Sequence, residues 1–533
     1  MKIFHNANIF STEYPNATAF VVDHGLIVAL GQDQDILSGF SKTNQIYDLQ
    51  GRTIWPGLTD AHVHLLKLAE TMSMVNCETD TISGCLERIH ERAKTLPPDA
   101  WVRGHGWNQN LWQAGFGDAE MLDSVTGGRP AYLTAKSLHA AWVNSKALSL
   151  AGIDEGTPDP PGGIIQRDAA GKATGILFEA EGMGLVESFI KPPSLSENCQ
   201  MLRELIPALW KMGLVGAHDF DGFDCWQALQ ALHQDGRLPF RVRKNIPFDK
   251  MKEFIKAGLL TDFGSNFLHI GGVKLFADGA LGPQTAAMFQ AYEDSFETGK
   301  LLLTGDEIFE IGQQAITNGL ALAIHAIGDR ANHVVLDAYE KLRKYELSNN
   351  LPHLRHRIEH VQIINPEDIR RLPLLDIIAS VQPVHAPSDM KMADRYLGAR
   401  AKHAYAYRDI IKSGAMVIFG SDAPVEPINP FQGIHAAVTR QQLDGSPGPE
   451  GWQPQQRLSL FEAVMGFSCW PAESTERGHR LGKIAGGAYA DFIILEDDPF
   501  AMNPQELARI QPSATFVNGN CVYQTSDHPF DFI

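Results

Sequence analysis

Eight short apolar segments, separated by stretches with helical or loop composition, restrict most strongly the folds that this chain can adopt. In chain order they read LTDAHVHL, MSMVNC, GLVGAHDF, GGVKLFAD, ALAIHAIG, HRIEHVQI, DIIASVQP and MVIFGSDAPV. Short apolar strands that alternate with helices are typical of a parallel α/β core, and eight is the strand number of a (β/α)8 barrel. The pattern therefore predicts a TIM barrel, which we place at residues 57–475.

Both ends of the chain have a different, all-β pattern. Residues 1–56 contain β patterns with no helix between them, and residues 476–533 contain ADFIILED and TFVNGNCVYQ, in which Asn518-Gly519 is a strong hairpin signal. Neither end is long enough to bury a core alone. We therefore predict that the two ends pair into one small β-sandwich.

The second and third predicted strands are much further apart in the sequence than the other neighbours. The gap, at about residues 98–190, has its own turn-rich sequence, DPPGGIIQRDAAGKATG. We expect an inserted subdomain in this part of the barrel.

The charge balance directs attention to a small-molecule substrate. Lys and Arg number 45 against 63 Asp and Glu, a formal net charge of −18, which repels nucleic-acid phosphates and anionic membranes. The six cysteines form no CxxC pair, and no apolar run reaches the roughly 18 residues of a membrane span. We expect a cytoplasmic protein that binds neither nucleic acid nor membranes. A homodimer is left open, because a barrel can pair through many faces.

Histidines and an aspartate recur at the carboxyl ends of the predicted strands. His62 and His64 lie one residue apart in PGLTDAHVHL, so both point to one face of their strand. His325, His360 and Asp422 each end a separate apolar strand. In a (β/α)8 barrel these ends meet at one mouth, where active sites are built. This shared placement favours a metal site over a set of unrelated structural histidines.

Lys274 interrupts the apolar run GGVKLFADG on the fourth predicted strand. A strand lysine commonly extends its ammonium to solvent, but at this mouth the charged form would repel a metal. Burial disfavours the charged form, and the neutral amine can take up carbon dioxide to become a carbamate. A carbamate is an anion with two oxygens, which suits it to bridge two metals about 3.5–4 Å apart.

Taken together, these residues resemble the amidohydrolase superfamily. Further segments resemble its YtcJ-like branch, which includes N-substituted formamide deformylase. They are PGLTDAHVHL, HAAWVNSKAL, DPPGGIIQRD, GGVKLFADGALGPQTAAM, HAIGD, HRIEHVQ, GSDAPVEPINP and GKIAGGAYADFIIL. The resemblance runs over nearly the whole chain, and it implies a TIM barrel flanked by a β-sandwich.

The resemblance also implies a function, a metal-dependent hydrolase that cleaves non-peptide carbon–nitrogen bonds of the amide or formamide type with a metal-activated hydroxide. It implies a divalent cofactor, expected to be zinc, as one ion or as two ions bridged by a carboxylated Lys274. Carried over position by position, it assigns one metal to His62, His64, Lys274 and Asp422 and the other to Lys274, His325 and His360. Asp422 and Lys274 are then the catalytic residues, with Asp422 passing a proton to the leaving amine.

One segment departs from the family pattern, because relatives often carry Asp-Gly-His where this chain has Ser137-Leu138-His139. This difference predicts an altered substrate range. The predicted substrate-binding residues are Trp107, His139, Trp142, Asp278, Gln382 and His385. The alternative interpretations are ordinary packing for the tryptophans, a loop cap for Asp278, and hydrogen bonds to loop backbone for Gln382 and His385.

Two other functions remain open from the sequence. A mononuclear deaminase of a cyclic base or aryl amine would keep the histidines and the aspartate without needing Lys274. A non-catalytic scaffold would keep the barrel and lose the metal. The intact set of six candidate ligands argues against this interpretation.

Overall fold

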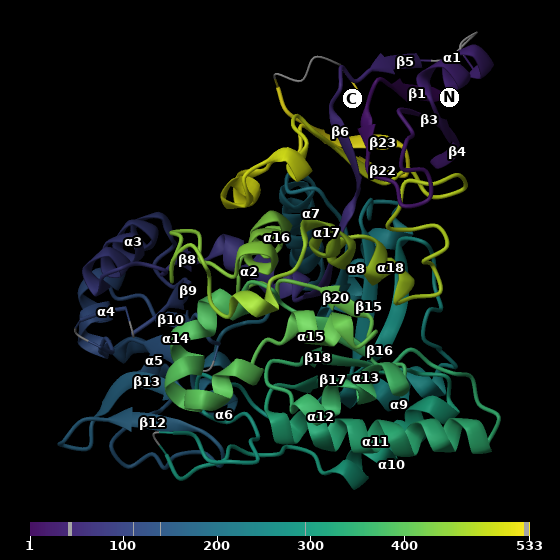
Figure 1. Cartoon of the computed structure of the whole chain (residues 1–533). Helices are drawn as coiled ribbons and strands as arrows, with labels where there is room; N and C mark the ends of the chain where they lie inside the picture. The colour runs from purple at the N-terminus through teal and green to yellow at the C-terminus, as the bar shows by residue number, and fades with distance from the viewer. Residues whose placement is uncertain are drawn as a thin grey trace. The chain divides into compact units, whose positions relative to one another are not determined.

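The structure is a computed structural model that describes residues 1–40, 45–109, 111–113, 115–138, 140–293, 295–526 and 532 (Figure 1). The chain forms two compact units, one of Met1–Leu65 with Leu202–Ile533 and the other of Leu66–Met201. Among the residues that the structure describes, no helix combines the length and the apolar character that crossing a membrane requires.

An eight-stranded, all-parallel sheet forms the core of the first unit. Its strands follow one another in chain order: β7 Leu58–Val63, β14 Leu214–Asp219, β15 Arg241–Pro247, β16 Leu268–Phe276, β17 Leu322–Ala326, β18 Arg357–His360, β19 Ile378–Val381 and β20 Val417–Phe419. Nearly every residue of these strands is buried, as expected for parallel strands covered on both faces. The predicted TIM barrel is therefore confirmed (Figure 1).

Helices follow the barrel strands along the chain. They are α7 Leu195–Lys211, α8 Phe223–Gln234, α9 Met251–Lys256, α10 Gly305–Thr317, α11 Asp329–Ser348, α12 Pro366–Ile369, α13 Arg371–Leu374, α14 His385–Leu397, α15 Tyr407–Lys412, α16 Pro430–Thr439, α17 Leu460–Phe467 and α18 Cys469–Glu473. Local sequence sets their starts: Thr304 and Glu307 form a capping box at α10, which satisfies backbone N–H groups that the first helical turn leaves free.

One predicted barrel strand was wrong, and one real strand was missed. The segment MSMVNC contributes β8 Val75–Asn76 to a separate sheet in the second unit. The third barrel strand is instead β15, whose sequence RVRKNIP carries three cationic side chains. Two of these charges are buried in ion pairs, with Arg241 bound to Asp491 and Lys244 Nζ 2.8 Å from Asp219, and the buried Arg243 guanidinium donates to the Ser474 carbonyl at 3.1 Å. The two errors offset each other, so β16 is still the fourth strand.

The two ends of the chain form two small sheets with one shared core. The sheet orders are β4-β3-β1-β5 and β2-β6-β21-β22-β23. The strands are β1 Lys2–His5, β2 Asn8–Ile9, β3 Ala19–Asp23, β4 Leu26–Gly31, β5 Gln45–Asp48, β6 Thr53–Pro56, β21 Phe492–Leu495, β22 Ala514–Val517 and β23 Asn520–Gln524. The prediction of no helix in the N-terminal segment was wrong, because helix α1 Asp33–Phe40 lies between β4 and β5.

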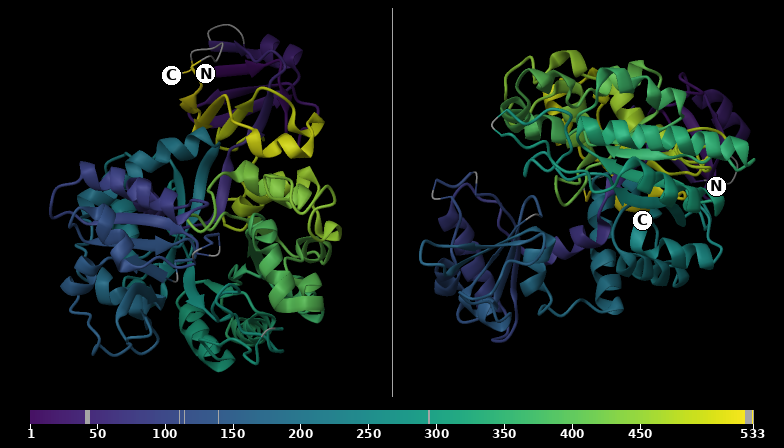
Figure 2. Two further views of the ribbon diagram at one scale, coloured as in Figure 1. Left: turned by 90° about the vertical axis from the view of Figure 1, so that its left-hand side faces the viewer. Right: turned by 90° about the horizontal axis from the view of Figure 1, so that it is seen from below.

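The core of these sheets contains phenylalanines from both ends of the chain. Phe4 and Phe20 stack at 4.9 Å between ring centroids, Phe492 and Phe516 stack at 4.3 Å, and Phe4 meets Phe492 edge to face at 5.2 Å. Figures 1 and 2 show the purple N-terminal and yellow C-terminal strands side by side. The predicted β-sandwich of both termini is therefore confirmed.

The second unit, Leu66–Met201, has its own six-stranded sheet of order β12-β13-β11-β10-β9-β8. Besides β8, the strands are β9 Val102–Trp107, β10 Ala131–Ala135, β11 Ala140–Val143, β12 Ile164–Arg167 and β13 Ala173–Phe178, and the helices are α2 Leu65–Ser73, α3 Ile82–Thr95, α4 Ala119–Thr126, α5 Ser145–Leu150 and α6 Glu179–Glu187. In the sequence this unit follows the first barrel strand, and it contains the whole predicted insertion at about 98–190.

The barrel closes between its last and first strands through the backbone just beyond β20. The Asp422 N–H donates to the His62 carbonyl at 2.8 Å, and the His64 N–H donates to the Ala423 carbonyl at 2.9 Å. The buried Asp60 carboxylate spans the same junction, because it accepts from the His62 N–H at 3.0 Å and the Ser421 N–H at 3.1 Å. Closure thus brings Asp422 next to the two histidines of the first strand.

Gly420 makes this closure possible. A Cβ atom at this position would lie 2.4 Å from the His62 backbone nitrogen and 2.8 Å from Asp60 Oδ1, much closer than non-bonded atoms allow. We expect Gly420→Ala to lower the free energy of unfolding by about 1–3 kcal/mol, because the two strands must move apart. Denaturant titration followed by circular dichroism measures this change.

Gly39→Ala is the matched control, because a Cβ there would meet nothing within 4 Å and Gly39 lies within helix α1. Its stability should equal or exceed that of the wild type. If Gly420→Ala were as stable as the wild type, the close approach of Gly420 to the first strand would not require a glycine.

Candidate metal centre

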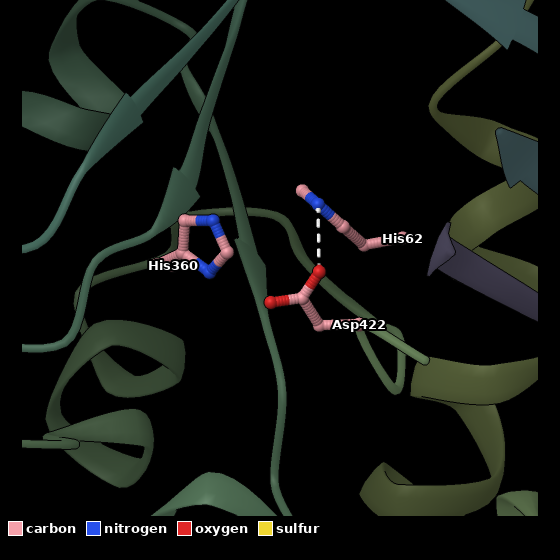
Figure 3. Close-up of side chains that lie close together, drawn as sticks. All are labelled: His62, His360 and Asp422. Carbon is pink, nitrogen blue, oxygen red and sulfur yellow. Dashed lines mark ion pairs between the residues drawn. The ribbon is translucent and has the colours of Figure 1, made fainter. Parts of the chain in front are cut away.

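Three candidate ligands from separate strands lie together at the barrel mouth. Ligand atoms of His62 at the end of β7, His360 at the end of β18 and Asp422 beyond β20 all lie within 4.8 Å of one another. His62 Nε2 is 3.4 Å from Asp422 Oδ1, and the His62 and His360 ring centroids are 4.9 Å apart. Figure 3 shows the imidazoles and the carboxylate facing one another. This arrangement fits one metal ion.

His64 joins the group from the first strand. Its Nε2 lies 3.5 Å from Asp422 Oδ1, and its Nδ1 lies 3.1 Å from Asp221 Oδ1. Both histidines of the HxH motif therefore approach the same carboxylate oxygen, as the strand geometry predicted.

His325, at the end of β17, contacts the group through His360, with ring centroids 4.5 Å apart. Its Nε2 lies 2.9 Å from the Gly279 carbonyl oxygen and 3.6 Å from Asp278 Oδ1. Because Nε2 is engaged in this way, Nδ1 is the nitrogen that can bind a metal.

Lys274 is buried on β16 and touches two aromatic rings that also contact the histidines. Its Nζ lies 4.7 Å from the Phe220 ring centroid and 4.8 Å from that of Phe276. Phe220 stacks on His62 at 4.0 Å, and Phe276 lies 5.3 Å from His325. Burial lowers the pKa of Lys274 to about 8, and the nearby carboxylates only partly oppose this effect.

Buried oxygen acceptors hold the histidines in place. His62 Nδ1 lies 2.7 Å from Glu359 Oε2, and His360 Nδ1 lies 2.9 Å from Gln382 Oε1. With Asp221 on His64, three rings have Nδ1 engaged and so present Nε2 to a metal. Such outer partners fix the tautomer and orientation of metal-binding histidines.

Sequence reasoning missed Glu359 and Asp221. Glu359 is fully buried one residue before His360, and it forms an ion pair with Arg357, whose guanidinium also donates to the Ala61 carbonyl at 2.7 Å. A charged pair in the segment HRIEHV was a usable signal, because charges within an apolar strand are buried only when paired.

Asp219, Asp221 and Cys225 form a second close group of ligand-type atoms. Lys244 Nζ lies 2.8 Å from Asp219 Oδ1, so an ammonium already neutralises this carboxylate. Asp219 accepts from the Asp221 N–H at 3.1 Å, which makes this group a support for His64.

Two of the ligand candidates have left-handed backbones. The φ angles are +77° at His360, +44° at Val361 and +60° at Asp422. Residues other than glycine reach this region at a cost of about 1–3 kcal/mol each, most of all β-branched Val361. Such conformations concentrate at functional sites because the surrounding structure holds them there.

The electrostatics of the site suit a cation. Burial lowers the pKa of His62 to about 4 and that of His325 to about 3, so both rings are neutral and have a lone pair for a metal near pH 7. Burial would also lower the pKa of His64, but its hydrogen bonds to Asp221 and Asp422 outweigh burial and raise it to about 9. The carboxylates thus stabilise positive charge at His64.

These residues therefore fit a divalent metal. The donor set of neutral imidazoles with a carboxylate is typical of zinc and similar ions, and metal binding replaces the protons that such ligands would otherwise carry.

The remaining predicted site residues divide into two groups. Gln382 and His385 lie beside His360, and Asp278 beside His325, whereas Trp107 and Trp142 are fully buried in the core of the second unit. The indole N–H groups of the two tryptophans donate to the backbone carbonyls of Leu133 and Asp118, each at 2.8 Å. Position 139, the remaining predicted histidine, lies outside the described residues.

Asp278 serves mainly as a loop cap. Its carboxylate accepts from three backbone N–H groups, those of Ile327, Gly328 and Ala287, at 2.8–3.0 Å. It thereby fixes the loop that carries the Gly279 carbonyl against the end of β17.

Comparisons with known proteins agree with this architecture. A family model described as the amidohydrolase family matches residues 45–523. The protein YtcJ of Bacillus subtilis (strain 168) is 32% identical, with 98% of this chain and 99% of YtcJ covered. N-substituted formamide deformylase of Arthrobacter pascens is 27% identical, with 97% of each chain covered. A solved structure of an uncharacterized metal-dependent hydrolase from Pyrococcus furiosus is 27% identical, with a TM-score of 0.76 over 94% of this chain and 99% of its own.

The Glu359 carboxylate provides a test of the metal centre. We expect Glu359→Gln to weaken metal binding by about 10–100-fold, because the neutral amide no longer holds the His62 ring as strongly. Metal affinity is measured by competition with a chelator, on protein whose fold is checked by circular dichroism.

Glu346→Gln is the matched control, because Glu346 is a second buried glutamate between a histidine and an arginine. It lies 3.1 Å from His356 Nε2 and 2.7 Å from a guanidinium nitrogen of Arg343. This change should lower stability and leave metal affinity intact. If the wild type and Glu359→Gln bound metal with equal affinity, the assigned role of Glu359 in metal binding would be wrong.

Proposed function

The chain belongs to the amidohydrolase family, and from this premise we propose that it is a metal-dependent hydrolase of carbon–nitrogen bonds in small molecules. The bond class is the non-peptide amide or formamide type. The observation that carries the proposal is the cluster of His62, His64, His360 and Asp422 at the barrel mouth, in which buried acceptors orient all three rings.

We assign the metal ligands as follows. His62, His64 and Asp422 would hold one divalent ion, expected to be zinc, and His325 and His360 would hold a second ion where two are bound. A carboxylated Lys274 would supply a ligand to each ion. When bound, the metal polarises a carbonyl group and lowers the pKa of water, so that hydroxide is available near neutral pH.

The residues of the chain supply proton transfer and orientation. Asp422 accepts a proton from the attacking water and delivers it to the leaving amine. Its pKa favours the accepting form, since His62 and His64 outweigh burial and hold the pKa well below its usual range. Glu359, Asp221 and Gln382 keep the rings fixed, so that little reorganisation is needed during the reaction.

The surroundings of Lys274 support the carbamate. The side chain is buried, its pKa is lowered to about 8, and its neighbours include two aromatic rings. A substantial neutral fraction of the amine is therefore accessible near pH 7–8, and only the neutral amine reacts with carbon dioxide.

One observation favours the second candidate, a mononuclear deaminase of a cyclic base or aryl amine. The Lys274 ammonium lies within cation–π distance of Phe220 and Phe276, an arrangement that needs no modification. One metal and an unmodified lysine would fit this candidate.

Replacing Asp422 by asparagine tests proton transfer. We expect Asp422→Asn to keep the fold and to lower kcat for any hydrolysed amide by at least about 10²–10⁴-fold, because asparagine cannot accept the proton. The measurement is turnover of N-formyl and N-acetyl anilides, with metal content determined for each protein. Unchanged turnover would contradict the assigned role.

Withholding carbon dioxide tests the bridge. Protein purified without carbon dioxide should lose metal and activity, and bicarbonate should restore both, because the carbamate reforms only from dissolved carbon dioxide. Elemental analysis gives the metal content, and intact mass under native conditions shows the added carboxyl group.

Lys274→Arg is the control for the bridge, since a guanidinium keeps the charge and cannot form the carbamate. It should not respond to bicarbonate. One metal in every preparation with an unmodified lysine would favour the deaminase, and no metal with no turnover would indicate a non-catalytic scaffold.

A further inference from the structure

Two phenylalanine rings flank Lys274, and they differ in burial. Phe220 is buried and stacks on His62, with 4.0 Å between ring centroids. Phe276 is 49% exposed, although its ring contacts two buried side chains, Lys274 and His325. Part of the Phe276 ring therefore packs on the candidate metal centre, and the rest of it is open.

Strand geometry directs Phe276 to the barrel mouth. Side chains two residues apart on a strand point to the same face, so Phe276 shares the face of β16 that carries Lys274. Phe276 is the last residue of β16, and it pairs in register with His325 on β17. The eight preceding residues of the strand are all buried. The open part of the ring thus lies at the carboxyl end of the strand, where barrel active sites are built.

Backbone hydrogen bonds hold this strand end in place. The Ala277 N–H donates to the His325 carbonyl at 2.9 Å, and the Leu302 N–H donates to the Ala277 carbonyl at 2.8 Å. The Phe276 ring itself lies 5.3 Å from the His325 ring, with a 41° angle between the two planes. A ring on a fixed strand end presents a preorganised surface, so little conformational freedom is lost when a ligand packs against it.

The open ring suits an apolar group, and an aromatic group most of all. Small-molecule pockets are lined mainly by hydrophobic and aromatic side chains, with a few polar groups that fix orientation. Here the candidate ligands supply the polar groups, and Phe276 supplies apolar surface beside them. A large apolar side chain that stays half in water forgoes part of its burial free energy. A bound aromatic ring would recover it and add a ring–ring contact.

We propose that Phe276 contacts an aromatic ring of the substrate that is bonded directly to the amide group. Attachment is direct because Phe276 touches Lys274 and His325, so a group that packs on Phe276 lies next to the reacting bond. The substrate class is thus an aryl amide, with its ring on the nitrogen, as in an anilide, or on the carbonyl carbon, as in a benzamide. The inference rests on the proposed hydrolysis of amides, and it makes Phe276 a specificity-determining residue.

Three variants test the contact. Phe276→Ala removes the ring, and Phe276→Tyr keeps it. Phe289→Ala is the matched control, because Phe289 lies on the loop that follows β16, is 50% exposed, and has its ring 5.4 Å from that of His333 on α11. It removes an equally exposed ring beside a histidine that is not a candidate ligand. Metal content is determined for each variant.

Binding of hydroxamates to metal-loaded protein is the first measurement. Acetohydroxamate, benzohydroxamate and N-phenylacetohydroxamate share one metal-chelating group, and the last two carry a phenyl ring on carbon or on nitrogen. The wild type should bind at least one aryl compound more tightly than acetohydroxamate, and Phe276→Ala should reduce that preference by about tenfold. Phe276→Tyr and Phe289→Ala should retain it. Because the preference is a ratio, any effect of Phe276 on the metal or on Lys274 cancels.

Turnover is the second measurement. The kcat/KM ratio of formanilide to N-methylformamide reports a ring on nitrogen, and the ratio of benzamide to acetamide reports a ring on the carbonyl carbon. In Phe276→Ala, the ratio for the side that meets Phe276 should fall about 10–100-fold. Phe276→Tyr and Phe289→Ala should keep both ratios.

Two results would overturn the proposal. One is an aryl preference in Phe276→Ala equal to that of the wild type, in binding or in turnover. The other is an equal loss for aryl and methyl compounds, which would give Phe276 a purely structural role beside Lys274.

The two hypotheses can fail independently. If the wild type hydrolyses no amide, the proposed function fails, and hydroxamate binding still decides the role of Phe276. If the wild type binds neither aryl hydroxamate more tightly than acetohydroxamate, the assignment of Phe276 fails whether or not amides are hydrolysed.

Discussion

The hydrogen bonds between the backbone beyond β20 and the end of β7 determine where the chemistry of this protein can occur. The bond from the Asp422 N–H to the His62 carbonyl fixes a carboxylate from the last strand against two histidines from the first. Those residues are 360 positions apart in the sequence (422 − 62), so only barrel closure brings them together. Gly420 and Asp60 contribute to the same junction, one by lacking a side chain and the other by accepting backbone N–H groups from both strands. The residues that close the fold are therefore the residues that assemble the site.

Most of the barrel could be predicted from the sequence, and the six ligand candidates remain a prediction that rests on strand position, because the carboxyl ends of parallel strands meet at one mouth. The failure at β15 has a physical cause. Arg241, Arg243 and Lys244 make that segment look polar, and partners distant in the sequence, such as Asp491, are what allow it to be buried. MSMVNC has the opposite property, since it is apolar yet pairs in another sheet. Residue type indicates how costly it is to bury a side chain without a partner. It does not show which distant residues will pair with that side chain and lower the cost.

The residues that orient the candidate ligands could not be predicted from the sequence for the same reason. Glu359 looks like an ordinary strand-end charge until Arg357 and His62 are seen on its two oxygens. Trp107 and Trp142 illustrate the converse, because a large aromatic residue near a motif can be pure core, as their hydrogen bonds to backbone within the second unit indicate. Candidate ligands can be proposed from motif and strand position, whereas the residues that orient them can be found only from three-dimensional contacts.

The left-handed conformations at His360 and Asp422 bear on how the site is held. Each is unfavourable in isolation, and both occur where a strand end must turn a ligand toward the mouth. Relaxation of either residue would move the imidazole or the carboxylate away from the cluster, so the surrounding bonds must outweigh the strain. The hydrogen bond between His360 and Gln382 opposes relaxation of the backbone at His360, and the hydrogen bond from the Asp422 N–H to the His62 carbonyl opposes it at Asp422. A bound metal would add to both, because it stabilises only the conformation in which the ligands converge. Metal binding by these candidate ligands would therefore be coupled to the local backbone geometry, and the stability of this part of the barrel would depend on the occupancy of the site.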